Sequence, residues 1–261
     1  MSATNQEQWI KTTCPRDCYD GCGIIVHKRN GEIIKVKGNR DHPSTRGPLC
    51  AKCAVSYNGV WLDENARLLY PLKRSGKKGS GKFERISWDD ALAEVANRFG
   101  DIDREHGADR IYHTHYTGTC SVIAGQFPKR FFNHIGATEV DPDTICNAAG
   151  HAALSYVFGD SAAGFDPRTS KDSKCILIWG ANPAHCGPHV YQHWLREHGA
   201  EVIVIDPVRT ETAASADLHL QVRPGADAAL AFSMLHIMKE ESLVDENYIK
   251  NHVQGYEEVL P

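Results

Sequence analysis

The sequence predicts an α/β protein, in which a small β-rich N-terminal domain is followed by Rossmann-like α/β domains with parallel strands. Two observations favour this fold class. Short β-branched runs surround a turn near the N-terminus, and in the second half buried-strand runs alternate with helical segments. Such alternation is typical of βαβ units, whose strands pair in parallel. We expect domains at 1–70 and 71–261, with ligand sites at the carboxyl ends of the parallel strands.

The composition excludes several classes of protein. The chain has 261 residues, enough for one large or two modest domains. Its 29 Lys and Arg against 33 Asp and Glu give no electrostatic footprint for nucleic acid or an anionic membrane. No apolar run approaches the roughly eighteen residues that span a bilayer, and the start lacks an apolar signal core and a twin-arginine pair. We therefore expect no nucleic-acid partner, no direct membrane span and a cytoplasmic location.

The N-terminal β-rich domain is predicted from residues 23–38, GIIVHKRNGEIIKVKG. Two β-branched runs flank Asn30-Gly31, a dipeptide that readily adopts the positive φ angles of a tight hairpin turn. A hairpin here returns the chain, so that residues 41–53, DHPSTRGPLCAKC, can bring Cys50 towards Cys14. A compact metal site built from distant parts of the sequence requires such a return.

The next segment changes from loop to helix and then to strand. Residues 71–85, PLKRSGKKGSGKFER, are rich in Gly, Ser and basic side chains, which predicts an exposed loop, with a phosphate-binding role as the less favoured alternative. Ser87 precedes an acidic turn and apolar residues at helical spacing, so we expect a capped amphipathic helix over 88–107. Residues 108–116 follow as a predicted strand.

The second half carries the clearest alternation of strands and helices. Buried strands are expected at 174–180 and 201–207, KCILIWG and EVIVIDP, and a further strand at 218–222, LHLQV. Helices are expected between and after them, at 189–199, HVYQHWLREHG, and at 224–241, PGADAALAFSMLHIMKEE. These segments form the βαβ pattern that predicts parallel strands.

The cysteines indicate a metal site. The chain has 9 cysteines, and Cys14, Cys18 and Cys22 crowd together near one end, which indicates metal ligation and not a secreted disulfide framework. Four thiolates can hold either zinc or a 4Fe-4S cluster. A zinc ribbon usually offers two C-x2-C pairs, and here only Cys50 and Cys53 have that spacing. The pattern favours the cluster over zinc, and by itself leaves both Cys50 and Cys53 open as the fourth ligand.

These motifs resemble the iron-sulfur domain of the bis-pterin molybdopterin oxidoreductases, the dimethyl sulfoxide reductase family. The resemblance rests on CPRDCYDGCG at 14–23, the hairpin and GPLCAKC at 47–53, and it extends through almost the whole remaining chain. It implies that a lysine two residues after the fourth ligand lies between the cluster and the nearer pterin. Here that residue is Lys52, which identifies Cys50 as the ligand and leaves Cys53 as an extra thiol.

The resemblance also implies a metal ligand within residues 141–159, DPDTICNAAGHAALSYVFG. Family members carry Ser, Cys or selenocysteine at this point, and the soft thiolate of Cys146 suits molybdenum or tungsten. The alternative is that Cys146 is a buried small apolar residue, the usual role of a lone cysteine. Asn147 follows it where members resembling formate dehydrogenases carry histidine, which counts against formate as the substrate.

Residues 179–189, WGANPAHCGPH, resemble the family's loop around a pyranopterin guanine dinucleotide. Gly180 would permit close backbone approach and Asn182 would supply hydrogen bonds. The segment is not a G-x-G-x-x-G loop, so an ordinary NAD site is disfavoured. The resemblance implies further cofactor contacts at the turns that follow, and in a looser correspondence at one earlier turn. These residues are Asp206, Arg209, Thr210, Gly225 and Asp227, and the earlier Gly118.

Structural alternatives exist for several of these residues. Asp206 could cap a loop, Arg209 could form a salt bridge, and Asp227 could be an acid favoured by the helix dipole. The remaining histidines are interpreted as packed or exposed residues and not as ligands, and the remaining cysteines as core or loop thiols. These are His113, His115, His185, His189 and His193, and Cys120, Cys175 and Cys186.

The resemblance implies the catalytic-subunit portion of an oxidoreductase with a 4Fe-4S cluster and molybdenum (or tungsten) bis-molybdopterin guanine dinucleotide. Two electrons exchanged with a small substrate would pass singly through the cluster to an electron-transfer protein or iron-sulfur subunit. Two alternatives stay open: an iron-sulfur electron-transfer module without the metal-pterin, and a non-redox hydratase-like relative. The family implies much more protein, so we expect incomplete α/β domains and an inactive isolated chain.

Overall fold

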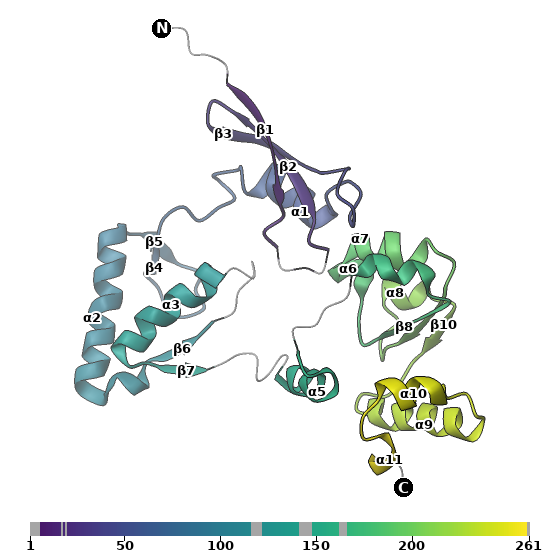
Figure 1. The fold of residues 1–261 in the computed structure, drawn as a ribbon. Coiled ribbons are helices and arrows are strands. Elements are labelled where there is room, and N and C mark those ends of the chain that lie inside the picture. Colours follow the sequence, from purple (N-terminus) through teal and green to yellow (C-terminus); the bar gives the residue numbers. More distant parts are fainter. Residues whose placement is uncertain are drawn as a thin grey trace. The chain divides into compact units, whose positions relative to one another are not determined.

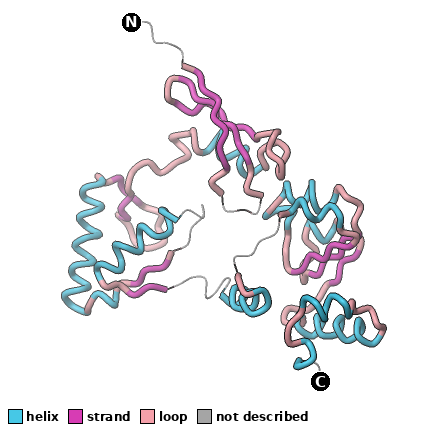
Figure 2. Tube along the Cα trace, in the orientation of Figure 1, coloured by secondary structure: helices cyan, strands magenta, loops and turns pink. Residues whose placement is uncertain are grey.

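A computed structural model describes residues 6–16, 18, 20–115, 122–140, 148–161 and 166–259. The chain divides into two compact units, which are described separately below. The first consists of Met1–Ser173 with Pro183–Gly199, and the second of Lys174–Asn182 with Ala200–Pro261. Both units mix helices and strands (Figures 1 and 2), which confirms the predicted α/β class.

The first unit begins with a three-stranded antiparallel sheet of β1 (Glu7–Thr13), β2 (Gly23–Arg29) and β3 (Glu32–Gly38). The predicted hairpin is confirmed, since Asn30 and Gly31 join β2 to β3 with φ angles of 52° and 90°. At the end of β3, a Cβ on Gly38 would lie 1.9 Å from the carbonyl oxygen of Gly47. Only glycine permits this close approach, which turns the chain towards Cys50.

After this return, the chain forms α1 (Ala51–Val55) and one π-helical turn, Ser56–Val60. A small core lies between the sheet and these turns. It contains Cys14, Cys22, Ile24, Val36, Cys53 and Tyr57. Three of these six core residues are cysteines, so the core of the N-terminal domain is also its thiol-rich region.

The segment predicted as an exposed loop is a short hairpin of β4 (Leu72–Arg74) and β5 (Phe83–Arg85). That prediction was wrong in conformation, although both strands are exposed as expected. Positive φ angles at Gly79 and Gly81 let the chain reverse. The glycines that suggested a loop therefore form a turn between two strands.

The predicted capped helix is α2 (Trp88–His106), where the Ser87 hydroxyl accepts a hydrogen bond from the Asp90 backbone N–H at 3.0 Å. The strand expected after it is shorter than predicted, because residues 108–110 form a 3-10 turn. It is β6 (Tyr112–Thr114), which pairs in parallel with β7 (Thr138–Val140). Two further helices of this unit are α3 (Val122–Ile135) and α5 (Ala148–Phe158).

The second unit contains a parallel sheet with the order β10-β9-β8. Its strands are β8 (Cys175–Trp179), β9 (Glu201–Ile205) and β10 (Leu218–Leu220). Its helices are α8 (Glu211–Ala214), α9 (Asp227–Glu240), α10 (Glu246–His252) and α11 (Tyr256–Val259). Val204 and Ile205 are fully buried, so β9 is the centre of this sheet's core. The predicted parallel strands are confirmed.

The connection from β8 to β9 belongs to the first unit and contains α6 (Pro183–Cys186), α7 (Pro188–Val190) and a π-helical segment, Tyr191–Arg196. The single helix expected over 189–199 is therefore divided. Gly199, with φ of 71°, ends the segment as predicted.

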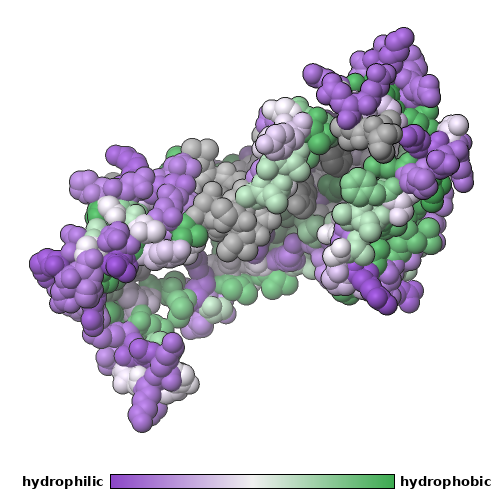
Figure 3. All heavy atoms as spheres, turned by 90° about the horizontal axis from the view of Figure 1, so that it is seen from below, coloured by the Kyte–Doolittle hydropathy of each residue, from purple (hydrophilic) through white to green (hydrophobic). Residues whose placement is uncertain are grey.

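Apolar side chains remain on the outside of several helices, including Leu92 and Val95 on α2, and Phe232 and Leu235 on α9. Figure 3 shows apolar surface, in green, between hydrophilic areas in purple. Such surface is typical of faces that pack against further protein. Among the described residues, no helix combines the length and apolar character needed to cross a bilayer.

Candidate functional site

The three closely spaced cysteines lie in the loop that joins β1 to β2. Cys14 directly follows β1 and Cys22 directly precedes β2, and the Cys14 N–H donates to the Cys22 carbonyl at 2.8 Å. Between them, Gly21 has a φ of 53°, and its N–H donates to the Cys18 carbonyl at 3.4 Å. Because the two strands are neighbours, the loop folds back on itself and brings the cysteines to one end of the sheet.

Cys50 and Cys53 both join this group. Cys50 is the N-cap of α1, and Cys53, one turn later, is only 3% exposed. The Sγ atom of Cys14 lies 3.7 Å from the Sγ of Cys53 and 2.9 Å from the Oη of Tyr57. Cys53 thus occupies the core, whereas Cys50 is only partly buried at the start of the helix.

The thiols lie close enough to shift one another's pKa values. Burial raises the pKa of Cys22 far above its usual range, and negative charge on Asp20 and on the other predicted ligand thiols adds to the effect. Burial likewise raises the pKa of Cys18, while the nearby Lys52 ammonium opposes that rise. Burial raises the pKa of Cys53 to about 12. Thiolates in such surroundings need a compensating cation, so this all-sulfur donor set fits a 4Fe-4S cluster.

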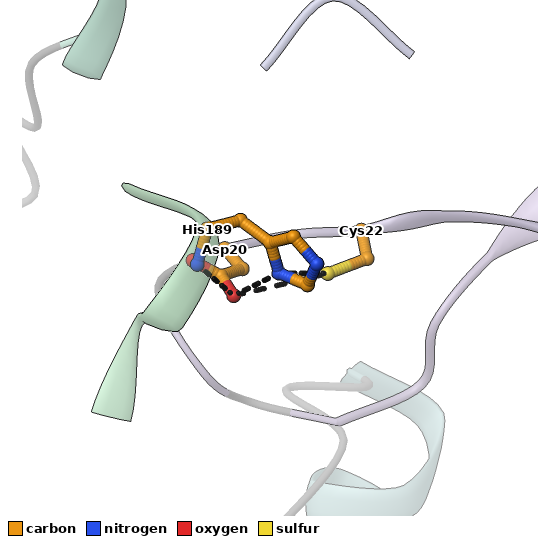
Figure 4. A group of neighbouring side chains, drawn as sticks. All are labelled: Asp20, Cys22 and His189. Atoms are coloured by element: carbon orange, nitrogen blue, oxygen red, sulfur yellow. Dashed lines mark hydrogen bonds and ion pairs between the residues drawn. The ribbon is translucent and has the colours of Figure 1, made fainter. Parts of the chain in front are cut away.

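A buried ion pair supports the cysteine loop (Figure 4). The Asp20 carboxylate lies 2.7 Å from Nδ1 of His189 and also accepts the backbone N–H groups of His189 and Val190, at 3.2 and 3.0 Å. The two side chains are 1% and 8% exposed. Nδ1 of the same histidine is 3.6 Å from the Sγ of Cys22. Asp20 therefore attaches the cysteine loop to α7 within the first unit.

The protonation of this pair follows from its contacts. His189 faces an acceptor at each ring nitrogen, because its Nε2 lies 2.7 Å from the Pro48 carbonyl, and an imidazole with two donors is the charged form. The hydrogen bond to Asp20 raises the pKa of His189. Burial opposes the ionisation of Asp20, but the hydrogen bonds from His189 and Val190 outweigh it and lower the pKa of Asp20.

Sequence reasoning missed this pair. It treated His189 as a packed or exposed residue and did not single out Asp20. The partners are 169 residues apart, and no local spacing signals a contact over that separation.

Lys52 lies beside the thiols. Its Nζ donates to the backbone carbonyl of His185 at 3.1 Å, and its charge acts on Cys18. His185 is three residues after Asn182 in the sequence. Lys52 therefore links the cysteine region to residue 185 of the predicted pterin loop, residues 179–189.

In the second unit, the predicted cofactor residues follow the carboxyl ends of β8 and β9. Gly180 has a φ of 60°, and its N–H donates to the Ile205 carbonyl at 2.8 Å, continuing the sheet. The Asn182 side-chain oxygen accepts from the hydroxyl of the buried Thr212 at 2.6 Å. This bond fixes the Asn182 amide, whose NH₂ group has no hydrogen-bond partner in the described part of the chain.

The turn after β9 contains three of the predicted cofactor residues, Asp206, Arg209 and Thr210. The buried Asp206 carboxylate accepts the N–H of Val208 at 2.7 Å, so it caps its own turn, as the structural alternative proposed. Thr210 is the N-cap of α8 and accepts from Ala213 at 3.1 Å. Arg209 is exposed and forms no ion pair with any residue that the structure describes.

The turn before α9 completes this edge of the sheet. Gly225 has a φ of 87°, which a side chain would disfavour. The Asp227 carboxylate accepts from the Trp179 indole N–H at 2.7 Å and so joins the end of β8 to the first turn of α9. Gly118, Cys120 and Cys146 lie outside the described residues, as does Asn147.

Comparison with known proteins identifies the family. Residues 67–251 match the family model of the molybdopterin oxidoreductases, and residues 7–60 match the molybdopterin oxidoreductase Fe4S4 domain. The chain is 35% identical over 260 residues to the probable oxidoreductase YoaE of Bacillus subtilis, covering 98% of this chain and 38% of that protein. It is 30% identical over 278 residues to the dimethyl sulfoxide reductase DmsA of Haemophilus influenzae, covering 99% of this chain and 34% of that protein.

A solved structure agrees with these matches. Acetylene hydratase from Pelobacter acetylenicus superimposes with a TM-score of 0.68 at 28% identity, over 95% of this chain and 34% of that one. The chain thus spans between a third and two fifths of the length of these relatives. The matched models support the predicted cofactors, a 4Fe-4S cluster and molybdenum bis-molybdopterin guanine dinucleotide. The chain therefore belongs to the molybdopterin oxidoreductase family, as its cysteine motif and strand-end loops predicted.

Proposed function

We propose that the chain is the N-terminal catalytic portion of a molybdenum (or tungsten) bis(pterin guanine dinucleotide) oxidoreductase that exchanges two electrons with a small substrate. The observation that carries this proposal is the gathering of the predicted ligand thiols beside Lys52, whose ammonium group donates to the His185 carbonyl. His185 lies within the predicted pterin loop, residues 179–189, three residues after Asn182. A redox centre and a cofactor-binding loop are thereby linked through one charged side chain.

The cluster ligands in this proposal are Cys14, Cys18, Cys22 and Cys50. Cys50 is proposed over Cys53 because the resemblance implies a lysine two residues after the fourth ligand, and Lys52 stands there. In the structure Cys50 begins α1 and is partly exposed, while Cys53 packs in the core beside Tyr57 and Cys14. Lys52 would hold a fixed positive charge beside the cluster, which favours an added electron. We also propose domain boundaries near those of the sequence analysis, 1–70 and 71–261.

The metal-pterin supplies the two-electron chemistry when bound, and the protein binds and orients it. Cys146 is proposed as the metal ligand. Asn182 and Asp206 would receive the polar edges of the guanine dinucleotide, and Arg209 with Thr210 its phosphates. The remaining proposed contacts are Gly118, Gly180, Gly225 and Asp227.

The proposed partner is an electron-transfer protein or iron-sulfur subunit that exchanges electrons with the cluster. A cytoplasmic location stays a prediction, which fractionation of the native host would test. Relatives named as dimethyl sulfoxide reductases make a small oxidised molecule the first substrate class to assay.

The experiment is anaerobic purification of the protein from its native host, with metal and cofactor analysis. We expect about four iron and four sulfide per chain, together with pterin and one molybdenum or tungsten. Iron and sulfide without the metal-pterin would contradict the oxidoreductase and favour an electron-transfer module. A colourless protein that holds only zinc would contradict the cluster as well.

A second candidate function is favoured by one observation, the similarity to acetylene hydratase. A hydratase adds water without net electron transfer, so its turnover needs no external acceptor. Turnover that depends on an artificial electron donor or acceptor would support the oxidoreductase. Hydration of a small unsaturated substrate without any artificial electron donor or acceptor would support the hydratase.

A further inference from the structure

A second group of potential metal ligands, which shares no residue with the cysteine region, lies at the parallel pair β6 and β7 of the first unit (Figure 1). His113 pairs with Glu139 in the register of the two strands. His115 lies two residues after His113, directly beyond the end of β6. The two imidazole rings stack with centroids 4.9 Å apart, and Phe132 covers His113 at 3.9 Å.

The ligand atoms of this group converge. One ring nitrogen from each histidine and one carboxylate oxygen of Glu139 all lie within 4.8 Å of one another. In a tetrahedral zinc site with bonds of about 2.0–2.1 Å, ligand atoms are roughly 3.3 Å apart. Small rotations of the His115 and Glu139 side chains, which are 22% and 30% exposed, can supply this contraction.

One nitrogen of each histidine lacks a hydrogen-bond partner among the described residues, and that of His115 lies 3.9 Å from Oε1 of Glu139. His113 is 6% exposed, and its Nδ1 and that of His115 are buried without a hydrogen bond to any described residue. Buried polar nitrogens are normally paired, so two unpaired ones on stacked rings indicate a missing ligand. The nitrogens of His189, in the other group of potential ligands, are both hydrogen-bonded and belong to the cysteine region.

The charges around the group favour the binding of one metal cation, with moderate affinity. Glu139 supplies the negative charge, and the Lys129 ammonium, 2.7 Å from its Oε1, holds the pKa of that carboxyl below its usual range. Lys129 competes with a metal for this oxygen, although the second carboxylate oxygen can serve as ligand. Two imidazoles and a carboxylate are a donor set that zinc accepts, and three protein ligands leave a fourth position open.

We propose that His113, His115 and Glu139 bind one zinc ion, or a divalent ion of the same class, at the β6-β7 pair. The ion would join the two strands and satisfy the unpaired imidazole nitrogens. This site is independent of the cluster and of the proposed redox function, since it shares no residue with either. The sequence analysis read both histidines as packed or exposed residues, because their spacing alone does not reveal Glu139.

The test uses the whole chain, purified without oxygen and with its cluster assembled, so that the four proposed cluster cysteines are already occupied. Zinc is added alone and the free metal removed, and the bound zinc is measured by elemental analysis and X-ray absorption. We expect one zinc per chain with nitrogen and oxygen ligands near 2.0–2.1 Å and no sulfur near 2.3 Å. Zinc bound through sulfur, or no retained zinc, would overturn the proposal.

Matched variants locate the site. Loss of a group that only supports a metal ligand typically weakens metal binding about 10–100-fold. Loss of a ligand itself should cost no less, so His115→Gln and Glu139→Gln should each weaken zinc binding at least about tenfold. His134→Gln, the same change at an exposed position of α3, should leave it unchanged. Iron content and circular dichroism verify that each variant is folded. Wild-type zinc affinity in both ligand variants would overturn the assignment.

Discussion

The cysteine region and the strand-end loops of the second unit build their candidate sites in different ways. In the cysteine region the side chains contact one another, as the Sγ of Cys14 does with Cys53 and Tyr57 at 3.7 and 2.9 Å. In the strand-end loops Asn182 and Asp227 each accept one hydrogen bond from another side chain, whereas other side chains contact nearby backbone. Asp206 accepts from Val208, and Thr210 caps the helix that follows it.

This difference indicates how strongly each site depends on any single side chain. The thiols are held next to one another by a folded core, so one replacement removes a donor that nothing else supplies. The strand-end groups are held by turns that persist without any one side chain. We therefore expect large, all-or-none effects of substitution in the cysteine region and graded effects at the strand ends.

Replacing Cys50 by alanine is the strongest test of this contrast. If the fourth iron is bound only by Cys50, Cys50→Ala should remove nearly all of the about four iron atoms per chain. Cys53→Ala is the matched control and should keep them, because Cys53 is a core thiol. Iron and sulfide analysis after anaerobic purification measures both. Retention of iron in Cys50→Ala with loss in Cys53→Ala would show that the fourth ligand is Cys53.

Asp20→Asn tests whether the cysteine region depends on its buried ion pair. Breaking one partner leaves the His189 charge uncompensated, and such losses cost about 3–5 kcal/mol in other proteins. We expect about 3 kcal/mol, since asparagine can still accept a backbone hydrogen bond. Urea unfolding of the anaerobically purified chain gives the free energy of unfolding.

The control for Asp20→Asn is the same change at Asp41, whose carboxylate pairs with Lys11 on the surface at 3.1 Å. An exposed pair of this kind contributes at most about 1 kcal/mol. Equal effects of the two substitutions would show that the Asp20–His189 pair does not stabilise the loop.

Local patterns predicted the fold where local chemistry determines it. Asn30-Gly31 predicted the first hairpin, and Ser87 predicted the start of α2, because turn and cap residues act on their immediate neighbours. The 71–85 segment was mispredicted because local residues indicate a turn but not the pairing of the strands around it. Its glycines do form a turn, but the pairing of β4 with β5 depends on residues on either side of that turn.

The candidate sites also contain parts that local sequence predicts and parts that depend on the tertiary fold. The spacing of Cys14, Cys18 and Cys22 predicted a metal site, and family resemblance selected the fourth cysteine. Neither Asp20–His189 nor the approach of Glu139 to the β6 histidines could be predicted, since both need the tertiary fold to bring distant residues together. The hydrogen bond by which the Asp206 carboxylate caps its own turn is also seen only in the structure, and its use of Oδ1 leaves the proposed cofactor contact untested.

Arg209→Gln tests the graded response expected at the strand ends. Arg209 forms no ion pair with the described residues, so its charge is available to a phosphate. A hydrogen bond to a charged group contributes about 1.5–3 kcal/mol, or roughly 10–100-fold in affinity. We expect the lower end, about tenfold weaker retention of the pterin guanine dinucleotide, because Arg209 is exposed. Cofactor content after dialysis measures this.

The matched control for Arg209→Gln is Arg130→Gln, the same change at an exposed position of α3. It should retain the cofactor as the wild type does. Complete loss of cofactor in Arg209→Gln would contradict the contrast, because a strand-end residue would then act in the all-or-none manner expected of the cysteines.

Lys52 lies in the cysteine region but is not a proposed cluster ligand, and its replacement should have the smallest effect. Lys52→Gln removes a positive charge beside Cys18 and keeps every thiol, so the cluster should assemble normally. Without that charge the reduced cluster is less favoured, and its reduction potential should fall by tens of millivolts. Lys52→Arg keeps the charge and should restore most of the potential, measured by anaerobic redox titration. An unchanged reduction potential in Lys52→Gln would contradict a role of the Lys52 charge at the cluster. Lys52 would then act only through its hydrogen bond to His185, and the potential of Lys52→Arg would be no closer to the wild-type value than that of Lys52→Gln.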